Sequence, residues 1–143
     1  LTADAGAGGL DGDALPLVPD WSFGLSADYE WYLGNQSMAY MGATLGYIGD
    51  RPIGSSFRNA DGSLRELDGY STLNLRTGLE TGRWFGEIYV RNVTNELGIN
   101  TVSDTNIAYT GNVTIAMITP RTLGIAAGVR FSTSMRMAIR FCA

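Results

Sequence analysis

The sequence predicts an all-β fold, an antiparallel sheet whose strands cross a membrane. Three observations support this prediction. Five segments alternate apolar and polar residues with the period of two that marks a β-strand. Each segment holds about 10 to 13 residues, which exceeds the ~5–6 typical of soluble sheets and is close to the ~9–11 that cross a bilayer at a tilt. The connections alternate between short and long, as they do in transmembrane barrels.

The first strand is expected at residues 21–33, in the stretch WSFGLSADYEWYL. Every odd position is apolar or aromatic, and the even positions are Ser, Gly, Asp, Glu or Tyr. Unpaired backbone amides are too costly in hydrocarbon, so a membrane sheet closes into a barrel with an apolar outer face and a polar inner face. Trp21 and Trp31 lie near opposite ends of the apolar side, as aromatic residues at two membrane interfaces do.

The second and third strands are expected at residues 38–48 and 70–80. The second follows the polar turn GNQS, and its other side is smaller and more polar. In the third, leucines alternate with Thr, Asn, Arg and Glu. The apolar sides of these two strands consist of Ala39, Met41, Ala43, Leu45, Tyr47, Leu73, Leu75 and Leu79.

The fourth and fifth strands are expected at residues 83–93 and 120–131. The dipeptide TG separates the third strand from the fourth, and the stretch RTLGIAAGVRF gives the fifth its alternation. The apolar sides of these strands consist of Trp84, Gly86, Ile88, Val90, Leu123, Ile125, Ala127, Val129 and Phe131.

Polar segments separate the strands. Residues 1–20, rich in Gly, Asp and Ala, are expected to be an external loop, and residues 49–69 and 94–119 are expected to be long loops. If the fifth strand ends in the periplasm, every short turn lies there and every long loop lies outside the cell. The apolar stretch GNVTIAMITP in the second long loop either extends the sheet above the membrane or begins the fifth strand early.

A soluble antiparallel sheet with one face on a protein core also alternates. A soluble β-sandwich binding module therefore stays open as an alternative, as does a passive outer-membrane channel or small barrel. Strand length and sorted loops favour the membrane. In a soluble module a second layer would enclose the apolar side chains Trp21, Phe23, Leu75, Ile88 and Ile125 together.

Composition narrows the function further. The chain has 143 residues, no histidine and a single cysteine, Cys142, so a Ser–His–Asp triad is impossible and a zinc site has little support. We expect no enzymatic activity, no metal and no cofactor. All ten basic residues are arginines, the net charge is −4, and no basic patch with interleaved aromatics stands out. A nucleic-acid partner is therefore not expected.

The polar sides carry charges that we expect to pair inside a wet lumen. If the dipeptide TG forms the turn between the third and fourth strands, Glu80 pairs with Arg83 and Arg76 lies opposite Glu87. Opposite charges on neighbouring strands stabilise a sheet by roughly 0.2–1 kcal/mol each. We favour the interpretation that these charges neutralise one another over the interpretation that they bind a ligand.

Four stretches spread between residues 15 and 131 are informative together, namely LPLVPDWSFGLSADYEW, YIGDR, LDGYSTLNLRTGLETGRWFGEIYVRNVTNE and PRTLGIAAGVRF. Their residues and order resemble the C-terminal end of a TonB-dependent outer-membrane receptor. The stretch IYVRNVTNE and the closing PRTLGIAAGVRF carry most of the likeness. The resemblance implies that the five strands are the last of a 22-stranded barrel with a plugged lumen, in the bacterial outer membrane.

Receptors of this family bind a scarce nutrient outside the cell, such as a ferric siderophore, haem, cobalamin or a glycan. They import it with inner-membrane energy that TonB relays to the plug. The plug and the TonB-contact segment would lie in an N-terminal part that is missing from this sequence, so we expect the chain to be a piece of a longer protein. The implied partners are outer-membrane lipid, TonB, the plug domain, the barrel-assembly machinery and the small-molecule nutrient.

The resemblance also implies an assembly signal in the fifth strand, formed by Thr122, Gly124, Val129 and Phe131. Chains of this family usually end at such a phenylalanine. Here the chain continues with STSMRMAIRFCA, so residues 132–143 form an atypical C-terminal tail.

Substrate contacts are expected in the two long loops. Arg51, Arg58 and Arg65 in the first would attract an anionic iron chelate or a carboxylated ligand. Tyr109 in the second would stack on a sugar or catechol ring. The competing interpretation is ordinary solvated loop charge, because four acidic residues of the first loop neutralise its arginines.

Overall fold

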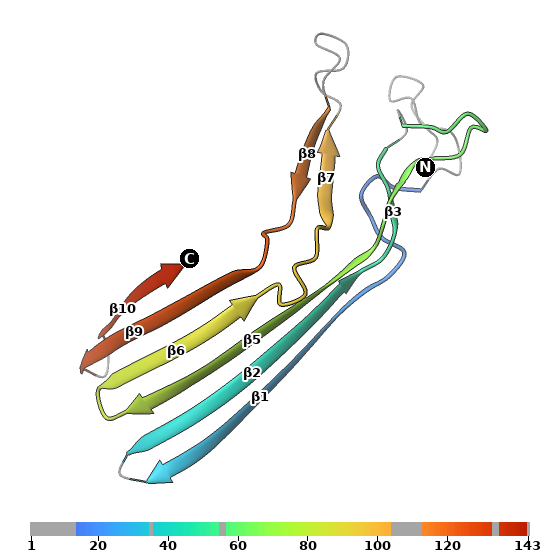
Figure 1. The fold of residues 1–143 in the computed structure, drawn as a ribbon. Helices are drawn as coiled ribbons and strands as arrows, with labels where there is room; N and C mark the ends of the chain where they lie inside the picture. Colours follow the sequence, from blue (N-terminus) through green and yellow to red (C-terminus); the bar gives the residue numbers. More distant parts are fainter. Residues whose placement is uncertain (1–13, 35, 55–56, 104–112, 133–134, 143) are drawn as a thin grey trace. The chain divides into compact units, whose positions relative to one another are not determined.

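The structure, a computed structural model, describes residues 14–34, 36–54, 57–103, 113–132 and 135–142. Strands are the regular elements of these residues, which confirms the predicted all-β, antiparallel fold (Figure 1). Within the described part of the chain no helix has the length and apolar character needed to cross a membrane.

The main sheet has six strands in the order β1-β2-β5-β6-β9-β10, and it does not close on itself (Figure 1). The first five of these strands begin and end within two residues of the expected positions. The sixth comes from the C-terminal tail, to which the sequence assigned no strand. The bounds are β1 Ser22–Gly34, β2 Ser37–Ile48, β5 Tyr70–Thr81, β6 Trp84–Arg91, β9 Thr122–Ser132 and β10 Met135–Cys142.

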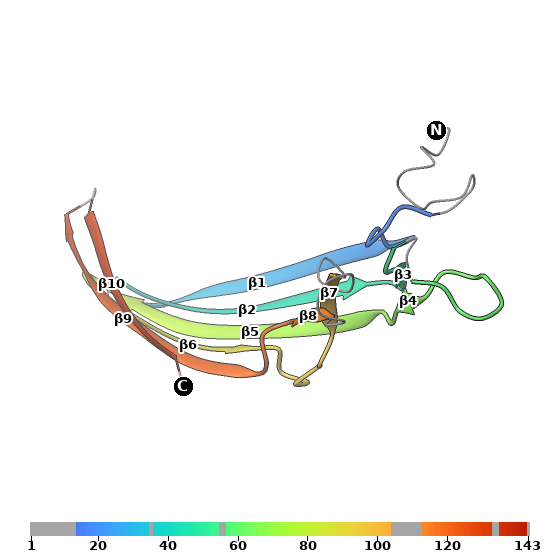
Figure 2. The same ribbon diagram turned by 90° about the horizontal axis from the view of Figure 1, so that it is seen from above.

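By its internal contacts the chain divides into two compact units. The first comprises residues 1–23, 47–71 and 97–118, and the second comprises residues 24–46, 72–96 and 119–143. The second unit contains most of the main sheet, as a single curved layer of strands (Figure 2).

Register places the apolar residues of the second unit on one face. Leu75 lies opposite Val90, and Ile88 lies opposite Ile125. These side chains are not enclosed: Leu75, Ile88 and Ile125 are 41%, 52% and 54% exposed. No second layer of described residues covers them.

Aromatic side chains gather near the turn end of this apolar face. Tyr29 and Trp31 stack with ring centroids 5.7 Å apart near the end of β1. Trp84 begins β6, and Phe131 lies near the end of β9; both are exposed. Aliphatic residues occupy the middle of the strands, so the face has an aliphatic centre and an aromatic margin.

The register of the β5–β6 hairpin corrects the predicted pairing. Glu80 lies opposite Phe85 and not Arg83, while Arg76 lies opposite Tyr89 and not Glu87. The connecting residues are 82–83, one position later than expected. Gly82 has a φ of +53°, which the first central residue of a type II′ turn requires and glycine adopts without strain. The partners shift by two residues, so every side chain keeps its predicted face.

The first unit holds two small hairpins in the segments that were expected to be loops. Strand β3 (Arg51–Pro52) pairs with β4 (Glu66–Leu67), and β7 (Ile99–Ser103) pairs with β8 (Thr114–Met117). The apolar stretch around β8 therefore neither lengthens the main sheet nor begins β9 early, because it pairs with β7 in a sheet of its own.

Aromatic rings also cluster in the first unit, around the start of β1. Trp21 stacks on Phe23 and on Tyr47, with centroids 5.8 and 4.6 Å apart. Trp21 and Phe23 remain 58% and 45% exposed, so they too are not enclosed in a core.

Candidate functional site

The polar face of the second unit is the candidate site, because its side chains form an organised set of contacts. Arg76 of β5 places Nη2 2.6 Å from Oδ1 of Asp28 in β1. Strand β2 lies between them, and Gly42 of β2 sits beneath the ion pair. A Cβ at Gly42 would overlap both side chains. The glycine therefore leaves the room in which this ion pair forms.

A second contact repeats this arrangement one strand further on. The hydroxyl of Tyr40 in β2 donates to Oε2 of Glu87 in β6, at 2.8 Å. Gly78 of the intervening β5 lies beneath the tyrosine ring, where a Cβ would overlap it. The guanidinium carbon of Arg76 lies 5.8 Å from the centre of the same ring. Tyr40 thus connects Glu87 with the Arg76–Asp28 pair.

A third contact joins β5 with β9. Arg130 donates from Nη2 to Oε2 of Glu80 at 2.7 Å, over strand β6. Further along the same face, opposite Arg76, the ring of Tyr89 in β6 lies over Gly124 of β9 so closely that a Cβ there would overlap the ring. Arg91 also lies over this ring, with its guanidinium carbon 5.2 Å from the ring centre.

All three contacts join strands that are not neighbours. Adjacent strands lie ~4.8 Å apart, so strands separated by one other lie ~10 Å apart. Only long side chains that lean toward one another bridge that distance. The first contact passes over β2, the second over β5 and the third over β6. Polar side chains converge on this face, whereas apolar side chains on the other face are left exposed.

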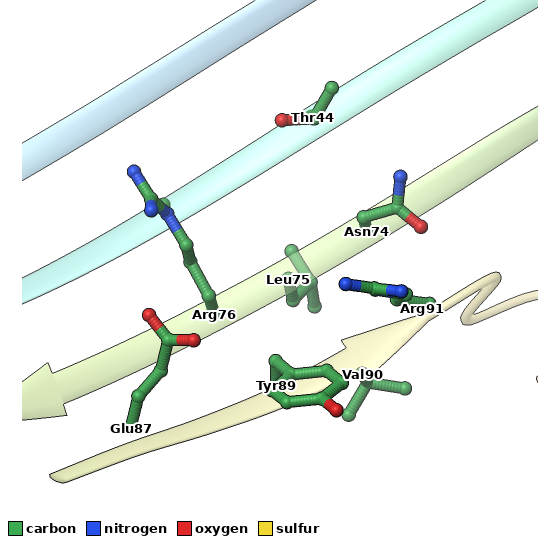
Figure 3. A pocket seen from close by; sticks show the side chains of 9 residues that line it. Thr44, Asn74, Leu75, Arg76, Glu87, Tyr89, Val90 and Arg91 are labelled. Atoms are coloured by element: carbon green, nitrogen blue, oxygen red, sulfur yellow. The ribbon is translucent and has the colours of Figure 1, made fainter. Parts of the chain in front are cut away.

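An open pocket of about 230 Å³ lies on the polar face along β5 and β6 (Figure 3). Its lining has hydrogen-bond donors in two guanidinium groups and one side-chain amide, and acceptors in one carboxylate and the oxygen of that amide. These groups are suited to binding a polar molecule by hydrogen bonds. Among the described residues, no three His, Cys, Asp or Glu side chains gather as metal ligands. The lining residues are Gly42, Thr44, Asn74, Leu75, Arg76, Glu87, Tyr89, Val90 and Arg91.

Three of the four predicted lumen charges, Arg76, Glu80 and Glu87, lie on the polar face, but their partners differ from those expected. Arg76 pairs with Asp28, Glu80 pairs with Arg130, and Glu87 accepts from Tyr40. Arg83 lies in the turn, where its carbonyl accepts the backbone N–H of Arg130 at 2.7 Å. The predicted Glu80–Arg83 and Arg76–Glu87 pairs are therefore wrong, because both depended on the shifted turn.

Asn92 has a structural role that the sequence did not predict. Its buried side chain donates to the carbonyls of Glu96 and Thr119 at 2.9 and 3.0 Å, and accepts the N–H of Glu96 at 2.9 Å. Its own N–H donates to Oδ1 of Asn74 at 2.9 Å. Its φ of +50° is a conformation that asparagine tolerates better than most residues. Asn92 therefore connects the end of β6 with the segment that leads into β9.

Arg51 is buried in the first unit. It donates to the backbone carbonyls of Ile99 and Asn100 in β7, and its guanidinium carbon lies 5.4 Å from the ring centre of Tyr70. Gly98 packs so closely on Tyr70 that a Cβ there would overlap the ring. Arg51 thus joins the bases of the two hairpins. Contact between Arg51 and a ligand stays a prediction.

The other predicted substrate residues are placed as follows. Arg58 donates to the carbonyl of Gly62 at 2.9 Å within the β3–β4 hairpin, and Arg65 is exposed near its base. Tyr109 lies outside the described residues. In the same hairpin, the hydroxyl and N–H of Ser63 donate to Asp61 and hold the pKa of that carboxyl below its usual value. The arginines and Tyr109 remain predictions as ligand contacts.

The predicted assembly-signal residues lie along β9. Thr122 lies opposite Arg91, Gly124 lies beneath Tyr89, and Val129 lies opposite Trp84. Phe131 is exposed near the end of the strand. Strand β9 is paired on both sides, with β6 and with β10, so it does not form the edge of the sheet.

Comparison with protein-family models, with curated proteins and with solved structures finds no match for this chain.

Proposed function

We propose that this chain is part of the barrel of an outer-membrane receptor that imports a scarce nutrient with energy relayed by TonB. In this proposal the exposed apolar face meets lipid, and the polar face lines the lumen of a barrel with further strands. The nutrient class is a ferric siderophore, haem, cobalamin or a glycan. The chain acts by binding and transport, without catalysis.

The exposed apolar face carries the proposal. In a soluble protein, other parts of the protein cover the apolar face of a sheet. A contiguous apolar patch that stays exposed marks a surface that binds a protein, a ligand or a membrane. Leu75, Ile88 and Ile125 lie together by register and are about half exposed. A shallow hollow of about 660 Å³ on the sheet is lined largely by apolar side chains of β1, β2, β5 and β6. Lipid acyl chains would fill this hollow at little cost, because neither they nor its apolar lining form hydrogen bonds with water.

The polar face supports the same orientation. Ion pairs and the Tyr40–Glu87 hydrogen bond converge there, over intervening strands. The inner face of a transmembrane barrel is polar, and its lumen tolerates charges that are paired or in contact with water. The placement of aromatic rings near strand ends, with aliphatic residues between them, also agrees with two membrane interfaces.

Lipid contact is tested on two neighbouring residues of β1 that are both exposed, Leu25 on the apolar face and Ser26 on the polar face. Single cysteines at these positions, in a Cys142→Ser background, carry a fluorophore in vesicles of brominated lipid. We expect strong quenching at Leu25 and little at Ser26. Equal, weak quenching at both positions favours the soluble β-sandwich module and contradicts the proposal.

Energy-coupled import is tested in cells. Uptake of labelled candidate nutrients by the bacterium that makes this chain is compared with uptake after its gene is deleted, with TonB present and absent. We expect uptake to require both. Uptake that needs the gene but not TonB would assign the passive channel instead.

A further inference from the structure

The C-terminal tail forms a regular strand in the main sheet. Strand β10 pairs antiparallel with β9 along its whole length, from Met135 opposite Ser132 to Cys142 opposite Gly124. One irregularity lies between Met135 and Arg136. A tail of unrelated sequence has no reason to pair in this way.

The alternation of the tail matches the faces of the sheet. Register places Met137, Ile139 and Phe141 opposite Val129, Ala127 and Ile125, which belong to the apolar face. The alternate residues of β10, which are Arg136, Ala138, Arg140 and Cys142, lie opposite Arg130, Ala126 or glycines of the polar face. A shift of one residue would have reversed both faces. The sequence of β10 therefore continues the pattern of β9 in the correct phase.

The connection to the tail also fits the arrangement of the other strands. Two residues separate β9 from β10, as two separate β1 from β2 and β5 from β6. These short connections alternate with the long ones after β2 and β6. The turn from β9 into the tail thus lies at the end of the sheet where the other short turns lie.

We infer that Met135–Cys142 is a sixth membrane strand, whose residues 137, 139 and 141 meet lipid and which forms the edge of the sheet in place of β9. This inference rests on the proposed function. A strand from the rest of a barrel then pairs with β10 and not with β9. One feature opposes the β9–β10 pairing, since Arg136 lies directly opposite Arg130, but Arg130 is already bound to Glu80.

Register is tested by disulfide formation in the full chain, again in a Cys142→Ser background. Residues opposite one another on antiparallel strands have Cα atoms ~4.5–5.5 Å apart, a separation that a disulfide spans. Ala127→Cys with Ile139→Cys is expected to cross-link under mild oxidation. The control, Ala127→Cys with Ala138→Cys, puts the two cysteines on opposite faces and is expected not to cross-link. Equal cross-linking in both variants, or none in either, overturns the inference.

Lipid contact of β10 is tested by brominated-lipid quenching at single cysteines replacing Ile139 and Ala138, with Leu25 and Ser26 as references. We expect Ile139 to match Leu25 and Ala138 to match Ser26. Quenching at Leu25 without quenching at Ile139 overturns the sixth strand and leaves the proposed function standing. Absence of quenching at Leu25 overturns both.

Discussion

Asp28 of β1 and Arg76 of β5 form an ion pair over Gly42 of the strand that separates them. The pair exists because the intervening residue has no side chain. The same relationship recurs where Tyr40 passes over Gly78. Glycines on the polar face therefore leave room for the long side chains of neighbouring strands.

Gly42→Ala is expected to break the Asp28–Arg76 pair and to destabilise the sheet by about 1–3 kcal/mol, the usual cost of overpacking. Gly24→Ala in β1 is the matched control, because a Cβ at Gly24 meets no atom within 4 Å. It should be neutral or slightly stabilising, since alanine reduces the entropy of the unfolded chain. Denaturant unfolding of the reconstituted chain measures both, and equal effects would contradict this role of Gly42.

The two ion pairs are expected to differ in strength. Side chains of Arg76 and Asp28 are 51% and 49% exposed, whereas those of Arg130 and Glu80 are 32% and 28% exposed. Exposed pairs contribute about 0.2–1 kcal/mol and weaken in salt. Double-mutant cycles with Asp28→Asn/Arg76→Gln and Glu80→Gln/Arg130→Gln should give the larger coupling energy for the second pair. The reverse order would show that burial does not decide their strength.

Asn92→Ala is expected to destabilise the fold by about 2–3 kcal/mol. The substitution leaves two carbonyls and one N–H without their partner, and it places alanine at a positive φ. Thr94→Ala, at an exposed position in the same turn, serves as the control and should stay within about 0.5 kcal/mol of the parent chain. The denaturant midpoints of unfolding measure this difference. A similar loss of stability in both variants would contradict the structural role of Asn92.

The β3–β4 hairpin is expected to respond to pH through Asp61. Its carboxylate accepts two hydrogen bonds from Ser63, which lowers the pKa of Asp61 in the folded hairpin. The resulting stabilisation is present above the ordinary pKa of aspartate and is lost as the pH falls through the lowered value. Ser63→Ala should move the pKa back toward the ordinary value, as followed by NMR titration. An unchanged pKa would exclude Ser63 as its cause.

The strands and their faces follow from the sequence because a period of two is a local property. The alternation in residues 21–33 or 120–131 determines the strand and its apolar side without reference to any other segment. The aromatic residues near the strand ends are likewise visible in the sequence.

The side-chain contacts do not follow from the sequence, because they depend on register and curvature. A turn at residues 82–83, one position later than expected, changed the partners of Glu80 and Arg76. Contacts such as Tyr40–Glu87 join strands that are not neighbours, and no rule for adjacent strands identifies them. Burial of Arg51 depends on β7, which lies almost 50 residues away in the sequence.

The most direct measurement of the central claim is the unfolding free energy of Ile125→Arg in lipid vesicles. If the apolar face of β9 meets acyl chains, this change costs about 2–4 kcal/mol near the middle of the bilayer. Leu97→Arg is the control, because Leu97 is similarly exposed but lies outside the main sheet, and it should stay within about 0.5 kcal/mol of the parent chain. A cost for Ile125→Arg as small as that of the control would show that water, not lipid, covers this face.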